Sequence, residues 1–98
     1  MFRLLKVTGD SLSPEYQDGD FVFIFRAPYC LGGIKPGDVV VFRHEPYGTL
    51  IKIVESLDSE LEEVYVTGVH PDSIDSRHFG TIHGKNLIGK VIGHFKKN

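Results

Sequence analysis

The hydroxyl of Ser11 lies in a setting that suits nucleophilic chemistry. Within Val7–Pro14, an apolar run enters a bend that carries Gly9, and a short turn follows. Such a bend can expose a hydroxyl and leave the backbone N–H groups of the turn available to an oxyanion. Serine in a turn also commonly bonds the local backbone without doing chemistry. Ser11 alone therefore leaves both interpretations open.

Lys52 is the candidate general base. It lies within Leu50–Val54, an apolar run with strand character on both sides of the lysine. On a strand Leu50, Lys52 and Val54 project to one face, so the ammonium has apolar neighbours. Burial disfavours the charged form of lysine, which lowers its pKa toward the range of a base. The alternative is an edge-strand lysine whose head group stays in water.

A third polar cluster spans residues 73–77 and contains two hydroxyls, a carboxylate and a guanidinium. Asp75 and Arg77 can pair, and the hydroxyl of Ser73 can hold a lysine amine in line with a nucleophile. A hydrogen-bonded turn is the other interpretation. The histidines show no metal-binding spacing with one another or with the single cysteine, Cys30, so we expect no metal and no cofactor.

Short runs rich in Val, Ile and Phe, bounded by Gly, Pro or Asp, predict an all-β chain that positions these residues. Two similar segments, 18–26 and 36–43, each lead from a Gly-Asp turn into such a run. We expect residues 56–62 to be a polar connection and residues 13–17 to form a short helix. The expected strands are Leu4–Val7, Phe21–Arg26, Asp38–Arg43, Thr49–Glu55, Glu63–Thr67, Thr81–His83 and Leu87–Phe95.

Length and composition narrow the classes of function. With 98 residues, the chain is expected to form a single domain, residues 1–98, whose site is a surface groove. A net charge of −2 argues against nucleic acid as a partner. Apolar runs of about five residues are too short for a membrane-spanning helix, which needs about 20. Without a long apolar leader, the expected location is the cytoplasm.

In order and context, these elements resemble the serine–lysine peptidases (S24/S26 type), which include the type I signal peptidases and the LexA-like self-cleaving domains. The nucleophile motif of that family, Ser-Met-x-Pro followed by Gly-Asp, resembles Ser11–Pro14 with Gly19-Asp20 beyond it. Leu12 stands in place of the usual methionine. The next two family blocks resemble Pro36–Phe42 and Leu50–Val54.

The last block separates the branches of the family, because residues 73–80 look like signal peptidases and not like LexA-like domains. The resemblance implies a partly open barrel of coiled antiparallel sheets. It also implies a Ser11–Lys52 dyad, with Ser73 orienting the lysine and Gly9 near the oxyanion position. Asp75 and Arg77 would brace this site, and a protein substrate would bind in extended form.

Lacking an anchor and a second β domain, the chain is most similar to short soluble relatives such as the maturation proteases of nickel-type superoxide dismutase. The expected activity is therefore removal of a leader or propeptide. Two alternatives stay open: a non-enzymatic β module that binds an extended peptide or a partner protein, and a LexA-like self-cleaving regulator domain. The sequence does not indicate an oligomeric state.

Overall fold

The computed structural model describes residues 2–7, 19–25, 33–68 and 74–96. These ranges contain seven strands and two short helical segments, joined by turns. The strands are β1 (Phe2–Lys6), β2 (Phe21–Phe25), β3 (Val39–His44), β4 (Gly48–Asp58), β5 (Glu63–Thr67), β6 (Ile82–His83) and β7 (Leu87–Phe95). The helical segments are α1 (Ser76–Phe79) and the 3-10 turn η2 (Gly84–Asn86).

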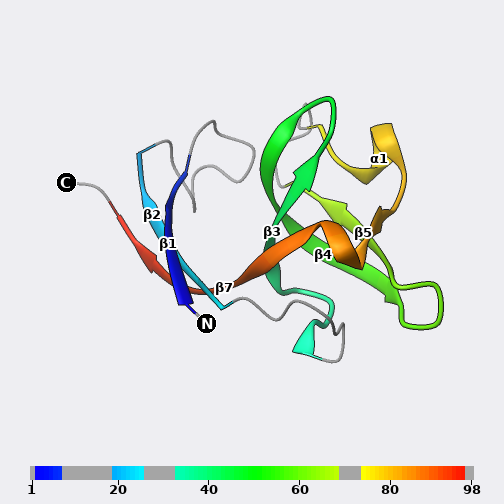
Figure 1. The fold of residues 1–98 in the computed structure, drawn as a ribbon, viewed down its shortest axis with the longest axis horizontal. Coiled ribbons are helices and arrows are strands. Elements are labelled where there is room, and N and C mark those ends of the chain that lie inside the picture. Colours follow the sequence, from blue (N-terminus) through cyan, green and yellow to red (C-terminus); the bar gives the residue numbers. More distant parts are fainter. Residues whose placement is uncertain (1, 8–18, 26–32, 69–73, 97–98) are drawn as a thin grey trace.

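The seven strands form one antiparallel sheet in the order β1-β2-β7-β3-β4-β5-β6. Strand β7, late in the sequence, lies in the middle and pairs with β2 on one side and β3 on the other. Figure 1 shows β7 crossing between the β1–β2 hairpin and the group formed by β3, β4 and β5. The sheet does not close into a barrel, because β1 and β6 occupy its two ends.

Both Gly-Asp turns begin a strand as the sequence predicts. Gly19 and Gly37 each adopt a φ of 95°, a conformation that side chains with a Cβ rarely take. Beside Gly37, the carboxylate of Asp38 accepts a hydrogen bond from the Lys35 N–H at 2.9 Å. Asp20 is more deeply buried, and its carboxylate contacts His94 of β7, whereas that of Asp38 contacts Lys90 of β7. The two turns therefore have the same backbone conformation at glycine, but their aspartate side chains contact different residues.

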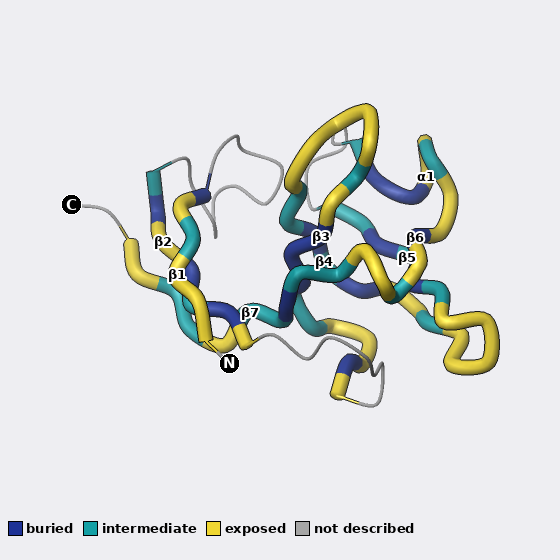
Figure 2. The backbone as a smooth tube through the Cα atoms, in the orientation of Figure 1, coloured by how far each residue is buried: buried dark blue, intermediate teal, exposed yellow. Residues whose placement is uncertain are grey.

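The core consists of two clusters on either side of the central strands, visible as the dark segments of Figure 2. The alternation of inward and outward side chains along each strand produces both clusters. The larger cluster contains Ile34, Val40, Phe42, Val54, Val64, Val66 and Ile82. The smaller cluster contains Val7, Val22, Ile24 and Val41.

The other face of the β1–β2 hairpin carries exposed apolar side chains. Phe2 is paired with Phe25, and Leu4 with Phe23, so these side chains share one face of the sheet. Phe2 stacks on Phe23 with ring centroids 5.4 Å apart. Phe2, Leu4 and Phe25 are exposed. The hairpin thus packs into the core through one face only.

The structure confirms the all-β class and the expected strands, with strand bounds that shift by one or two residues and two larger differences. Strand β4 runs to Asp58, beyond the expected end at Glu55, because the polar residues after the bulge near Val54 and Ser56 pair with β5. Residues 76–79, interpreted as part of a turn, form helix α1. The helix expected at 13–17 lies outside the described residues. No described helix is long and apolar enough to cross a membrane.

Candidate active site

Lys52 is buried in the middle of β4, with 1% of its surface exposed. It lies opposite Val40 of β3 in the register and two residues from Val54. Both valines belong to the larger core cluster, so the lysine stem enters an apolar environment. The expected burial of Lys52 is confirmed, and the alternative of a solvated edge lysine is wrong.

Burial lowers the pKa of Lys52 below its ordinary value of 10.5, since the charged ammonium loses hydration. Two charges from the 75–77 region modulate this effect. The carboxylate of Asp75 raises the pKa of the lysine, and the guanidinium of Arg77 lowers it. The charges of Asp75 and Arg77 therefore both act on Lys52, and loss of hydration has the largest influence on the pKa of the lysine.

Asp75 is completely buried, and its carboxylate accepts several hydrogen bonds. The guanidinium of Arg77 binds it in a fork, with Nε 2.9 Å from Oδ1 and Nη2 2.8 Å from Oδ2. The backbone N–H of Arg77 also donates to Oδ1 at 3.0 Å, which caps helix α1. Such a bidentate pair fixes direction as well as distance. The expected pairing of Asp75 with Arg77 is confirmed.

The environment of Asp75 favours its ionised form. Burial by itself would raise the pKa of this carboxyl. The hydrogen bonds from Arg77 and Gly68 outweigh burial and hold the pKa well below the ordinary value of 3.8. The same contact raises the pKa of Arg77. Asp75 is therefore ionised, and its negative charge is buried next to Arg77.

Two contacts attach the segment around Asp75 to β5. The N–H of Gly68 donates to Oδ2 of Asp75 at 2.9 Å, and thus joins the two sides of residues 69–73. The buried hydroxyl of Ser76 accepts a hydrogen bond from the Val66 N–H at 2.8 Å. Sequence reasoning included Ser76 in the polar cluster but did not predict this role. No feature of the sequence indicates which strand the hydroxyl meets.

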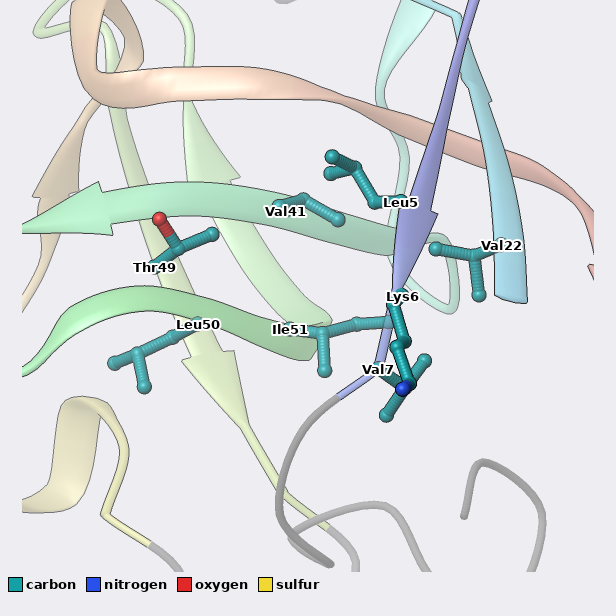
Figure 3. A pocket seen from close by; sticks show the side chains of 8 residues that line it. All are labelled: Leu5, Lys6, Val7, Val22, Val41, Thr49, Leu50 and Ile51. Atoms are coloured by element: carbon teal, nitrogen blue, oxygen red, sulfur yellow. The ribbon is translucent and has the colours of Figure 1, made fainter. Parts of the chain in front are cut away.

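A pocket of about 270 Å³ opens between β1 and β4 on the side of the smaller core cluster (Figure 3). Apolar side chains line most of it, and Lys6 contributes a charge at the rim. Ile51, on its wall, immediately precedes Lys52. The lining residues are Leu5, Lys6, Val7, Val22, Val41, Thr49, Leu50 and Ile51. The pocket has the size and lining to receive a small apolar side chain.

Three of the expected site residues, Gly9, Ser11 and Ser73, lie outside the described residues. The flanks of the segment that contains Gly9 and Ser11 are described. Val7 donates its N–H to the Asp20 carbonyl at 2.7 Å, and the Gly19 N–H donates to the Val7 carbonyl at 2.9 Å. The roles of the three residues remain predictions.

Sequence reasoning missed the contact between His94 and Asp20, whose Nε2 and Oδ2 atoms are 2.7 Å apart. The two residues are 74 positions apart, and no local pattern predicts their pairing. Among the described residues, no group of three or more His, Cys, Asp or Glu side chains is placed to hold a metal ion.

A comparison with protein families matches residues 1–61 to the family described as signal peptidase, peptidase S26. The match covers more than half of the 98 residues. It includes Ser11 and Lys52 and ends before Ser73. No individual curated protein matches the chain significantly.

Proposed function

The chain belongs to the signal peptidase family, peptidase S26, and from this premise we propose that it cleaves peptide bonds with a Ser11–Lys52 dyad. Family membership implies a serine peptidase that acts on a protein substrate. The observation that carries the proposal is the burial of Lys52 together with its lowered pKa. A neutral amine can accept a proton, whereas an ammonium cannot.

In the first half of the proposed reaction, the Ser11 hydroxyl oxygen attacks the scissile carbonyl carbon while neutral Lys52 takes the hydroxyl proton. The resulting oxyanion accepts hydrogen bonds from backbone N–H groups near Ser11, with Gly9 close to that position. The carbon–nitrogen bond then breaks. The Lys52 ammonium returns the proton to the leaving amine, and an ester to Ser11 remains.

In the second half, Lys52 removes a proton from water, which attacks the ester and releases the acid product. Ser11 regains its proton from Lys52. Ser73 is proposed to orient the amine through both halves. Asp75 and Arg77 brace the site, because their bidentate pair fixes the segment that carries Ser73 to β5 through the Gly68 contact.

The substrate is proposed to bind in extended form along β1, an end strand of the sheet. Main-chain pairing to such a strand provides affinity, and side-chain pockets provide specificity. The pocket between β1 and β4 supports this arrangement, since Leu5, Lys6 and Val7 of the β1 end line it. We propose removal of a leader or propeptide in the cytoplasm, and the precursor of a nickel-type superoxide dismutase is one substrate to test.

Cleavage of a panel of leader peptides by the purified chain tests this function. Ser11→Ala and Lys52→Ala are each expected to abolish turnover while the fold survives, because each removes one partner of the dyad. Turnover by the unmodified chain should rise with pH as Lys52 loses its proton, with a midpoint below 10.5.

Lys35→Ala is the matched control, because the side chain of Lys35 is 72% exposed and lies outside the proposed site. It should retain full turnover. If Lys52→Ala cleaved as fast as the unmodified chain, the dyad would be wrong. Retained binding of leader peptides without any cleavage by the unmodified chain would support the non-enzymatic alternative.

A further inference from the structure

Asp20 is a buried carboxylate at the start of β2, with 2% of its surface exposed. Its Oδ2 atom is 2.7 Å from Nε2 of His94, on β7, and the His94 side chain is itself mostly buried. A carboxylate removed from water needs a hydrogen-bonding or charged partner. Both the imidazolium and the neutral ring protonated at Nε2 donate from this atom. We call this contact the Asp20–His94 clamp.

The clamp lies beside Val7 and Gly19, the described residues on either side of the segment that contains Ser11. The Asp20 carbonyl accepts a hydrogen bond from the Val7 N–H at 2.7 Å, and the Val7 carbonyl accepts one from Gly19 at 2.9 Å. These two bonds continue the pairing of β1 with β2 beyond Lys6 and Phe21. They also join the two ends of residues 8–18. Whatever fixes Asp20 therefore fixes both ends of that segment.

The second Gly-Asp turn provides an internal comparison. Asp38 also meets a β7 side chain, with Nζ of Lys90 3.2 Å from Oδ2. Asp38 additionally accepts from the local N–H of Lys35, as the turn alone requires. Its turn is hydrogen-bonded to Val54 of β4, the strand that carries Lys52. The two turns thus have the same motif and the same partner strand, but only one of them borders the nucleophile segment.

We propose that the Asp20–His94 clamp fixes the two ends of the segment that carries Ser11, so that His94 is a positioning residue for peptide cleavage. This inference rests on the proposed function, because it assigns Ser11 as the nucleophile. β7 also pairs with β3, the neighbour of the strand that carries Lys52. His94 therefore connects the serine segment to the lysine strand through one rigid sheet.

Kinetics on a leader peptide separate positioning from simple stabilisation. In His94→Leu, which removes the donor, kcat should fall about 10- to 100-fold, as expected for a small misplacement of reacting groups. KM should change less than kcat, because most of the residues that line the pocket between β1 and β4 lie outside the clamp. His94→Gln should recover most of kcat, since a glutamine amide can donate from nearly the same position as Nε2.

Lys90→Met is the matched control, because it removes a β7 partner from Asp38 of the other Gly-Asp turn. It should leave kcat at the level of the unmodified chain. All rates are to be measured at a temperature where urea unfolding shows that each variant is folded. A His94→Leu variant with full kcat per folded molecule would overturn the positioning role, even if its stability fell.

Amide hydrogen exchange tests the clamp without any catalysis. In His94→Leu the Val7 and Gly19 amides should exchange faster than in the unmodified chain, while the Val54 amide, bonded to the Asp38 carbonyl, should not change. If the unmodified chain cleaves no peptide, the proposed function fails and exchange alone decides about the clamp. Faster exchange then supports it, and unchanged exchange at Val7 and Gly19 overturns it.

Discussion

The two most buried carboxylates of the described residues, Asp20 and Asp75, are held by partners of different chemistry. Each lies after an expected site serine in the sequence: Asp20 follows Ser11, and Asp75 follows Ser73. Asp75 faces the planar fork of Arg77. Asp20 faces one ring nitrogen of His94. Asp75 accepts a hydrogen bond from the Gly68 N–H across residues 69–73, and the Asp20 carbonyl accepts one from the Val7 N–H across residues 8–18. The guanidinium of Arg77 is charged at every physiological pH.

This difference indicates that the two parts of the proposed site, one around Lys52 and one around Ser11, have different requirements. The side that braces Lys52 has a fixed charge, and that charge acts on the pKa of the lysine. In the proposed mechanism, Ser11 requires a correct position more than it requires a charged neighbour. A histidine, which donates in either protonation state when the proton is on Nε2, meets this requirement.

The largest stability effect is expected when each carboxylate is made neutral without a change of shape. Asp75→Asn should lower the free energy of unfolding by about 2 kcal/mol, because it weakens the charge-assisted hydrogen bonds between a buried carboxylate and the half-exposed Arg77. Asp20→Asn should cost about 1 kcal/mol, since the amide oxygen can still accept a hydrogen bond from His94. Urea unfolding at pH 7 measures both. Equal losses in the two variants would contradict the proposed difference.

The same comparison predicts a pH dependence. Because the pKa of Asp75 is held below 3.8 in the folded chain, its ionisation stabilises the fold fully above that value. This contribution is lost as the pH falls through and below 3.8, where the unfolded chain binds the proton more readily. The unmodified chain and Asp75→Asn should therefore converge in stability under acid conditions. A stability difference that is constant from pH 7 to pH 2 would show that the ion pair is not its source.

A smaller effect, of opposite sign, is expected at Lys52. Its amine is buried, but among the described residues it is not part of a bidentate ion pair such as Asp75–Arg77. Lys52→Met should raise the free energy of unfolding at pH 7 by about 1 to 2 kcal/mol, since it removes a desolvated ammonium and keeps the volume. The lowered pKa means that stability of the unmodified chain rises as the pH approaches 10.5. The advantage of Lys52→Met should therefore shrink at high pH, as unfolding at pH 7 and pH 10 will test.

The smallest effect is expected at the ion pair between the exposed Lys35 and Asp38, whose charged atoms Nζ and Oδ1 are 3.4 Å apart. Lys35→Ala should change stability by less than about 0.5 kcal/mol, because exposed ion pairs contribute little. Thermal unfolding provides the measurement. A loss comparable to that of Asp20→Asn would mean that burial does not distinguish the two Gly-Asp turns.

Much of the fold follows from local patterns in the sequence. The β-branched runs after Gly19 and Gly37 predict strands, because the turn and the strand are both encoded within a few residues. The burial of Lys52 follows from its apolar neighbours on both sides. The end of β4 was missed because its last residues are polar, and an exposed strand that pairs on one edge tolerates such residues.

The rest depends on contacts between residues that are distant in sequence. Helix α1 has four residues and no apolar period, and it is held by the Asp75 cap, the buried hydroxyl of Ser76 and the packing of Phe79 against the larger core cluster. The contact between Asp20 and His94 depends on β7 lying beside β2. Antiparallel pairing of distant strands has no local signature, so this contact was not predicted from the sequence.

The central place of β7 has a consequence for biosynthesis. During translation the β1–β2 hairpin and the β3–β4–β5 group emerge first, yet within the described sheet only β7 pairs with both. Chains lengthen by about 5 to 20 residues per second, and native contacts that span the whole chain form late. The half with Ser11 and the half with Lys52 therefore unite only after residues 87–95 leave the ribosome. If the dyad assignment holds, a nascent chain has no proteolytic activity until that moment.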